Sequence, residues 1–156
     1  MAGSTVATTL ILIRHGERNN PAAGDPPGGQ SLNGDGKARA KLLVHVLGQT
    51  GIKVIYTSSF IRTQEMAQPL AAQLAPVTSV KLDEPVQIKK HISLNHAGKT
   101  ILVIGHSNTV PQLINLFTGG QLPDINDLEF DNMFVLTALN SGKAFVTRLK
   151  YGKRTP

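Results

Sequence analysis

Short apolar runs recur along the chain, separated by polar and amphipathic segments, and these runs predict six β-strands. Two of them, Leu10–Ile13 and Ile101–Ile104, have no polar interruption, which is typical of strands buried on both faces of a sheet. The predicted strands are Thr8–Ile13, Ile52–Thr57, Val77–Leu82, Thr100–Gly105, Met133–Thr137 and Ala144–Leu149.

Four of the segments between these strands predict helices. In the first, Asn33 or Asp35 provides an N-cap, and glycines within Gly48–Gly51 end the helix. Its expected apolar stripe consists of Ala38, Leu42, Leu43, Val46 and Leu47. The second helix is expected from about Phe60 to Leu74, after a cap at Ser58–Ser59 and with Pro69 kinking or dividing it. The third should run from a cap at Asp83 to about Asn95, and the fourth from Asn108 or Thr109 to Phe117.

This order of elements, βαβαβαβαββ, predicts an α/β fold. Strands that alternate with helices form a mostly parallel sheet with helices on both faces, which gives three layers, α/β/α. The last two strands flank a turn at Asn140–Gly142 and form a hairpin, so we expect an antiparallel edge. No linker or repeat divides the chain, and we expect one domain over residues 1–156.

Composition narrows the possible functions. Of 156 residues, 40% are hydrophobic and none is cysteine, which fits a globular protein without disulfides or thiolate metal sites. The formal charge of +6 favours acidic partners, but aromatic residues make up only 4%, which argues against a platform for single-stranded nucleic acid. We therefore expect neither a nucleic-acid nor a membrane partner. No membrane span or secretory signal is visible, so the expected location is the cytoplasm.

Basic side chains follow three of the predicted strands. Arg14 and His15 follow the first, Arg62 lies just beyond the second, and His106 follows the strand that ends at Gly105. Because ligands of doubly wound sheets bind at the carboxyl ends of the strands, we expect these four side chains to meet in one crevice. Two histidines and two arginines with few acids nearby suit a phosphoryl group, whose oxygens match the arginine fork.

Four sequence blocks resemble the histidine phosphatase superfamily, which has the phosphoglycerate-mutase-like fold. They are Arg14-His15-Gly16-Glu17, Ser31-Leu32-Asn33-Gly34-Asp35-Gly36, Thr57-Ser58-Ser59-Phe60-Ile61-Arg62-Thr63 and Gly105-His106-Ser107, in the order of the family. The small size of the chain is similar to that of bacterial protein phosphohistidine phosphatases.

The resemblance implies a phosphatase that hydrolyses phosphomonoesters or phosphoramidates, including protein phosphohistidine. His15 would be the nucleophile that forms a phosphohistidine, and its second ring nitrogen should donate to a backbone carbonyl. Arg14, Arg62 and His106 would bind the phosphoryl oxygens. The resemblance implies no metal and no cofactor. The substrate would be a phosphorylated small molecule or a phosphoprotein.

Several assignments have alternatives. Arg18 would be a further phosphate ligand or a solvent-facing charge, and Asn108 would contact substrate or cap a helix. Family members that resemble acid phosphatases have an aspartate where this chain has Ser107. We therefore expect the proton donor to be Glu84, although Asp83 and Glu84 also suit a helix start. Glu17 orients water or an arginine, or stays solvated.

Two other functions are compatible with the same pocket. One is a phosphotransferase of the phosphoglycerate mutase type, which is disfavoured because the short chain has little to build a lid over the site. The other is a phosphate-binding module without turnover. His91 and His96 are five positions apart and should lie on different faces of a helix, so we do not expect them to share a metal. The sequence does not indicate an oligomeric state.

Overall fold

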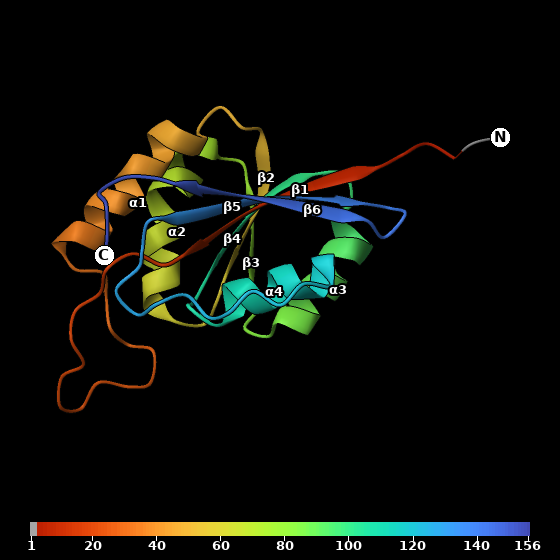
Figure 1. Ribbon diagram of the computed structural model, residues 1–156. Helices are drawn as coiled ribbons and strands as arrows, with labels where there is room; N and C mark the ends of the chain where they lie inside the picture. The colour runs from red at the N-terminus through yellow and green to blue at the C-terminus, as the bar shows by residue number, and fades with distance from the viewer. Residues whose placement is uncertain (1–2) are drawn as a thin grey trace.

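The computed structural model describes residues 3–156 and contains the ten predicted elements in the predicted order (Figure 1). The strands are β1 Ala7–Arg14, β2 Ile52–Thr57, β3 Thr78–Lys81, β4 Thr100–Gly105, β5 Asn132–Leu139 and β6 Ala144–Lys150. The helices are α1 Gly34–Leu47, α2 Ile61–Leu74, α3 Pro85–Asn95 and α4 Thr109–Thr118.

All six strands form one sheet in the order β3-β2-β4-β1-β5-β6. The strands β3, β2, β4 and β1 are parallel, whereas β5 runs antiparallel to β1 and β6 antiparallel to β5. The predicted mostly parallel sheet with an antiparallel edge is therefore confirmed. Arg14 at the end of β1 pairs in register with Gly105 at the end of β4, so the segments that follow these strands begin side by side.

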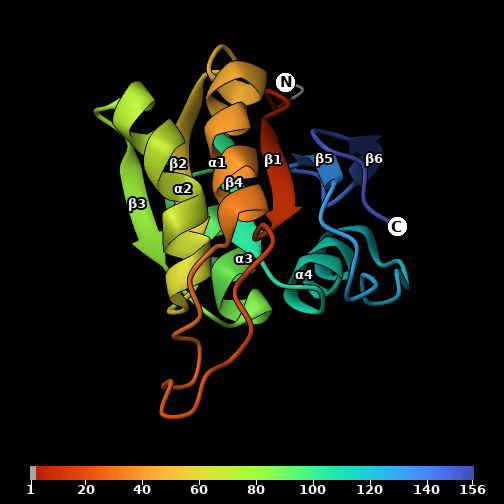
Figure 2. The same cartoon turned by 90° about the vertical axis from the view of Figure 1, so that its left-hand side faces the viewer.

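Helices cover both faces of the sheet (Figures 1 and 2). Ile11 and Ile13 of β1 pack into a core with α1 and α2, while Leu10 and Leu12 pack into a second core with α3 and α4. Because alternate side chains of β1 enter different cores, every position of the run is apolar. This explains the uninterrupted hydrophobic pattern and confirms the predicted three layers.

The first helix begins at the predicted cap but buries a different stripe. The side chain of Asn33 accepts a hydrogen bond from the backbone N–H of Gly36 at 3.0 Å. The buried residues are Gly36, Arg39, Ala40, Leu43 and Leu47. Ala38 and Val46, which the sequence pattern placed on the apolar stripe, are exposed. The buried face of α1 therefore differs from the predicted stripe. It includes Arg39, whose guanidinium forms an ion pair with Glu17 that hydrophobicity alone does not reveal.

Two other helix starts differ from the sequence-based prediction. Ser58 and Ser59 do not cap α2, whose N-cap position is occupied by Phe60 without a side-chain bond, and Pro69 lies within an unbroken helix. Asp83 does not cap α3; its carboxylate accepts a hydrogen bond from the backbone N–H of Ser59 at 2.7 Å instead. Among residues 3–156, no helix has the length and apolar character needed to cross a lipid bilayer.

A long loop projects from the sheet edge at which β1 ends (Figure 2). A β-bridge between Arg18 and Leu32 closes its base, so residues 19–30 form an excursion between two anchored positions. The loop returns to the body of the protein at Gly28, whose carbonyl accepts from the backbone N–H of Ile61 at 3.2 Å. The predicted loop therefore lies beside the first turn of α2.

Candidate active site

His15 lies immediately after β1 and is almost completely buried. Its Nδ1 atom is 2.7 Å from the carbonyl oxygen of Gly16. A carbonyl oxygen only accepts hydrogen bonds, so Nδ1 carries the hydrogen and Nε2 of the neutral ring carries the lone pair. This matches the expected donation to a backbone carbonyl.

Arg62 in the first turn of α2 contacts that lone pair. Its Nε–H donates to Nε2 of His15 at 3.0 Å, and its guanidinium carbon lies 4.6 Å from the centre of the Phe60 ring. The contact requires a neutral His15, since a protonated Nε2 has no lone pair to offer. The guanidinium of Arg62 therefore occupies the lone pair of Nε2 in this structure.

The surroundings keep both site histidines neutral. Burial lowers the pKa of His15 to about 3; the bond to Gly16 acts in the opposite direction, and the positive charges of Arg62 and Arg14 lower the pKa further. Burial, and then the charge of Arg62, lowers the pKa of His106 to about 4. Both rings are consequently unprotonated near neutral pH.

His106 follows β4, and its ring centroid lies 5.3 Å from that of His15. Its Nε2 atom is 2.9 Å from the hydroxyl oxygen of Ser58, which in turn is 3.0 Å from that of Thr63. Phe60 packs edge-on against the same ring at 4.9 Å. Ser58 therefore fixes the imidazole of His106 rather than a helix end, a role that no sequence pattern indicated.

Arg14 joins the end of β1 to the segment before β5. Its Nη1 donates to the backbone carbonyls of Asn126, Asp127 and Glu129 at 3.0, 2.9 and 3.0 Å. The guanidinium also stacks on the Phe130 ring at 4.1 Å, and burial lowers its pKa to about 10. These contacts form a wall of the site that no sequence pattern indicated.

Two buried donors of the site have no hydrogen-bond partner within residues 3–156. They are Nε of Arg14 and Nη1 of Arg62. Buried polar groups are nearly always paired, and an unpaired guanidinium N–H is especially costly. Two such donors in residues that adjoin a neutral histidine suit an anionic ligand.

Arg18 adds a third positive charge. It lies four positions after Arg14, in the β-bridge that closes the long loop, and its Nη1 donates to the carbonyl of Asn19 at 3.2 Å. Its charge lowers the pKa of Arg14 and of Arg62, after burial, so the three guanidiniums lie within electrostatic range of one another. The site is strongly positive before any ligand binds.

The candidate acids Glu84, Asp83 and Glu65 make different contacts. Glu84 is exposed at the N-cap position of α3 and makes no side-chain cap bond. Its neighbour Asp83 is close enough to His106 for its carboxylate to oppose the lowering of that histidine's pKa. Glu65 accepts from the backbone N–H of Leu32 at 2.7 Å and so holds the end of the long loop.

Glu17 and Asn108 have structural contacts. Glu17 forms a two-point ion pair with buried Arg39, at 2.6 and 3.0 Å, and Arg39 also donates to the carbonyls of Tyr151 and Lys153. The pair therefore connects the turn after β1 to α1 and to the end of the chain. Asn108 is exposed and accepts from the backbone N–H of Thr109 at 2.9 Å, as a residue at a helix start does.

A close backbone contact explains two of the glycines in the sequence blocks. A β-carbon on Gly16 would lie 2.9 Å from the α-carbon of Gly36, and one on Gly36 would overlap the carbonyl oxygen of Glu17. Only glycine at both positions lets the turn after β1 pack against the start of α1. The placement of His15 thus depends on these two residues.

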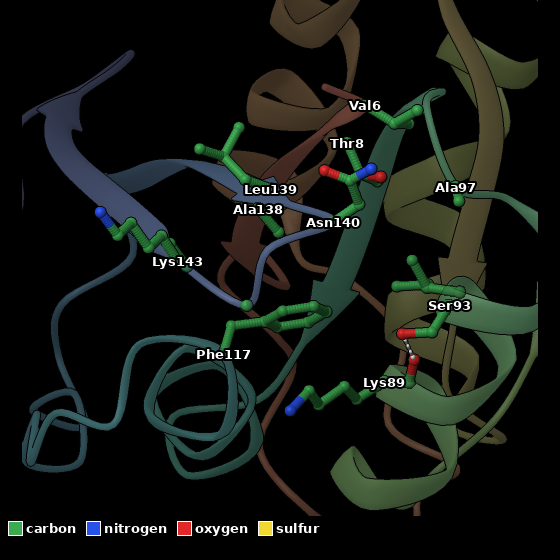
Figure 3. A pocket seen from close by; sticks show the side chains of 13 residues that line it. Val6, Thr8, Lys89, Ser93, Ala97, Phe117, Ala138, Leu139, Asn140 and Lys143 are labelled. Atoms are coloured by element: carbon green, nitrogen blue, oxygen red, sulfur yellow. Dashed lines mark hydrogen bonds between the residues drawn. The ribbon is translucent and has the colours of Figure 1, made fainter. Parts of the chain in front are cut away.

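A separate hollow of about 310 Å³ lies among α3, α4 and the β5–β6 hairpin (Figure 3). Lys89, Phe117 and Lys143 line it, whereas His15 and His106 do not.

The side chains of His91 and His96 lie close together, with ring centroids 5.4 Å apart. The expectation that they lie on different faces of a helix was therefore wrong, because α3 ends at Asn95 and His96 lies outside it. Within residues 3–156, no cluster of three or more His, Asp or Glu side chains could hold a metal ion.

Comparison with solved structures shows the same fold in several phosphatases. The protein histidine phosphatase SixA complexed with tungstate is 20% identical, with a TM-score of 0.73 over 91% of this chain and 96% of that one. The α-ribazole phosphatase from Shigella flexneri is 15% identical, with a TM-score of 0.71 over 92% and 96%. A mycobacterial glucosyl-3-phosphoglycerate phosphatase is 12% identical, with a TM-score of 0.70 over 94% and 100%.

At these identities the structural likeness shows the fold and not the substrate. No curated protein matches the sequence. The family model of the histidine phosphatase superfamily, branch 1, matches residues 10–87, which include the first three sequence blocks and Arg14, His15 and Arg62. The chain belongs to the histidine phosphatase superfamily.

Proposed function

We propose that the protein is a phosphatase that works through a phosphohistidine on Nε2 of His15. The observation that carries the proposal is the neutral, buried His15, whose Nε2 lone pair faces the guanidinium of Arg62 at 3.0 Å. A nucleophile must be unprotonated at the attacking atom, and this ring is held so by burial and by two arginines.

The reaction takes two displacements. The N–H of Arg62 first leaves Nε2 of His15 for a phosphoryl oxygen. The freed lone pair attacks phosphorus, an N–P bond forms, and the bond from phosphorus to the leaving oxygen or nitrogen breaks. Water then attacks the same phosphorus, the N–P bond breaks, and inorganic phosphate leaves while His15 returns to its neutral form. The phosphoryl group carries its charge on its equatorial oxygens throughout, so fixed cations contribute most of the catalysis.

The arginines supply that charge. Within residues 3–156, Nε of Arg14 and Nη1 of Arg62 are buried donors without hydrogen-bond partners, and phosphoryl oxygens would accept from both. His106, fixed by Ser58, would donate to the same group once the dianion raises its pKa. Arg18 would add a further contact from the base of the long loop.

A proton donor is needed when the leaving group is a poor one. Within the Asp83–Glu84 pair, Glu84 was the candidate from sequence, but the electrostatic contact with His106 supports Asp83. We propose that Asp83 protonates the leaving atom and that Glu84 remains solvated. Phosphoramidates need less of this help because their leaving nitrogen takes up a proton readily.

We extend the proposal to phosphoramidate substrates, with protein phosphohistidine as the leading case. The likeness to a protein histidine phosphatase over nearly the whole chain supports this choice. So does the short segment between α2 and β4, which holds only β3 and α3 and leaves little material for a lid. Such a site would accept a side chain presented by another protein.

Hydrolysis of p-nitrophenyl phosphate in the presence of EDTA tests the proposal. The wild type should turn over, and His15→Ala should not, while both retain the same circular dichroism spectrum. Equal turnover by the two proteins would contradict the assignment of His15. Transfer of phosphate to an alcohol acceptor instead of water would favour the mutase alternative.

A further inference from the structure

The strand β6 forms an edge of the sheet, and no strand from residues 3–156 pairs with its outer side. Edge strands offer unpaired backbone N–H and C=O groups, and proteins usually protect them with proline, bulges or inward-pointing charges. Over its seven residues, β6 has no proline, and its pairing with β5 is regular from Ala144 to Lys150. It is therefore a free template for a further strand.

The hydrogen-bond pattern shows which groups point outward. Beyond the two ends of the β5–β6 pairing, Tyr151 donates to the carbonyl of Asp131 and Leu139 donates to that of Lys143. Hydrogen-bonded pairs alternate along an antiparallel ladder, so Phe145, Thr147 and Leu149 bond to β5. The N–H and C=O groups of Ala144, Val146, Arg148 and Lys150 consequently face away from the sheet.

Apolar side chains accompany this free edge. Phe145 is 61% exposed and Leu149 is 47% exposed. Leu149 lies opposite Met133, which packs in the core with α1 and α2, so Leu149, Thr147 and Phe145 share the sheet face of those helices. The end of the β5–β6 hairpin extends beyond the two helices (Figure 1).

We propose that β6 pairs antiparallel with β6 of a second copy of the chain, about a two-fold axis at Thr147. In this register Thr147 faces Thr147 of the partner subunit across a non-hydrogen-bonded pair. Phe145 faces the partner subunit's Leu149, and the outward groups of Val146 bond to those of the partner subunit's Arg148. The two sheets become one continuous sheet through a self-complementary contact.

The side chains select this register over its neighbours. An axis at Arg148 would set two guanidiniums directly opposite each other, which is destabilising. An axis at Val146 would place Phe145 against threonine and lose both apolar pairs. With the axis at Thr147, apolar residues face each other twice, threonines meet at the centre, and no charge lies opposite a like charge.

The remaining charges of the strand do not prevent association. Arg148 and Lys150 lie on the other face and already pair with Glu129 at 2.7 and 2.9 Å, and Lys150 also pairs with Asp131 at 3.0 Å. Their positive charges are therefore compensated within each subunit. The edge lacks the uncompensated lysines that usually keep such strands apart.

A single cysteine tests the register directly, because the chain has none of its own. Across a non-hydrogen-bonded pair the α-carbons lie about 4.5 Å apart, within the range of a disulfide. Oxidised Thr147→Cys should migrate as a covalent dimer, whereas Phe145→Cys, which faces Leu149 and not itself, should stay monomeric under the same conditions. A dimer formed by Phe145→Cys but not by Thr147→Cys would overturn the register.

Sedimentation at high micromolar concentration tests the contact without cross-linking. The wild type should form dimers, and Val146→Pro should not, since proline removes an outward N–H and leaves the bonds to β5 intact. The pair Phe145→Lys with Leu149→Lys should also be monomeric, while Phe145→Glu with Leu149→Lys should dimerise again. A wild type that remains monomeric, or a Val146→Pro dimer, would overturn the proposal.

Discussion

Nε of Arg62 lies 3.0 Å from Nε2 of His15, although the two residues are 47 positions apart in the chain. The first turn of α2 places the arginine, and the end of β1 places the histidine. The bond forms only with a neutral ring whose hydrogen is on Nδ1, and the carbonyl of Gly16 fixes that hydrogen. One arginine thus holds the His15 ring through Nε, while its buried Nη1 has no hydrogen-bond partner within residues 3–156.

Neither His15 nor His106 should gain a proton as the pH falls from 8 to 5. Their pKa values are lowered to about 3 and about 4, below the ordinary value of about 6.5. Imidazole chemical shifts in NMR spectra, assigned with His15→Gln and His106→Gln, should stay flat across this range. A sigmoidal change in either assigned resonance between pH 8 and 5 would contradict the lowered pKa values.

The lowered pKa values of His15 and His106 also determine how the folding stability changes with pH. The unfolded chain binds protons at these histidines below about pH 6.5, while the folded chain does not until about pH 4. The stability that the neutral rings contribute is therefore present above pH 6.5 and is lost as the pH falls toward 4. A urea midpoint that rises on acidification through this window would contradict the assignment.

Arg62→Lys should lower kcat by about 10²- to 10³-fold, the usual cost of removing one fixed donor to a transition state. Lysine keeps the charge, but all its donors radiate from one nitrogen, so it cannot match phosphoryl oxygens bidentately as the planar guanidinium does. Steady-state kinetics with p-nitrophenyl phosphate provide the measurement. Full activity in Arg62→Lys would show that charge alone suffices.

Ser58→Ala should lower kcat by about fivefold to tenfold, because the lost bond to His106 is worth ~1 kcal/mol. Ser58 positions the imidazole of His106 and does not touch the reacting atoms. Without this bond the orientation of the ring is less fixed, so phosphate binding should also weaken. Ser59→Ala is the matched control, since exposed Ser59 uses its backbone N–H and not its side chain. Equal losses in both variants would refute the positioning role.

Asp83→Asn should lower the turnover of a substrate more strongly when the leaving group of that substrate is more basic. The amide can still accept the bond from Ser59 but cannot donate a proton as a carboxylic acid does. Turnover of an alkyl phosphomonoester should fall far more than that of p-nitrophenyl phosphate, while Glu84→Gln should leave both unchanged. The reverse result would return the role of acid to Glu84.

The sequence predicted the sheet and the core of the site because both follow local rules. Uninterrupted apolar runs indicated strands buried on both faces, and the carboxyl ends of those strands had to meet at one edge. The same rule placed the candidate residues Arg14, His15, Arg62 and His106 at this edge. Their side chains converge because parallel register places Arg14 beside Gly105.

The other contacts of the site are tertiary and leave no periodic signal. The ion pair between Glu17 and Arg39 spans 22 positions and buries an arginine that hydrophobicity would place outside. The segment from Asn126 to Phe130 reaches Arg14 across more than a hundred positions. Ser58 occupied a plausible helix cap, and only the structure shows that it contacts His106 instead.

Detection of phosphate on His15 during turnover would test the central claim most directly. A reaction quenched in alkali, which preserves phosphohistidine, would be digested and examined by mass spectrometry. The peptide that contains His15 should carry a phosphoryl group on Nε2 in the wild type, and this species should disappear when substrate is exhausted and be absent from His15→Ala. Sustained turnover without any phosphate on His15, or with phosphate on another residue, would contradict the account.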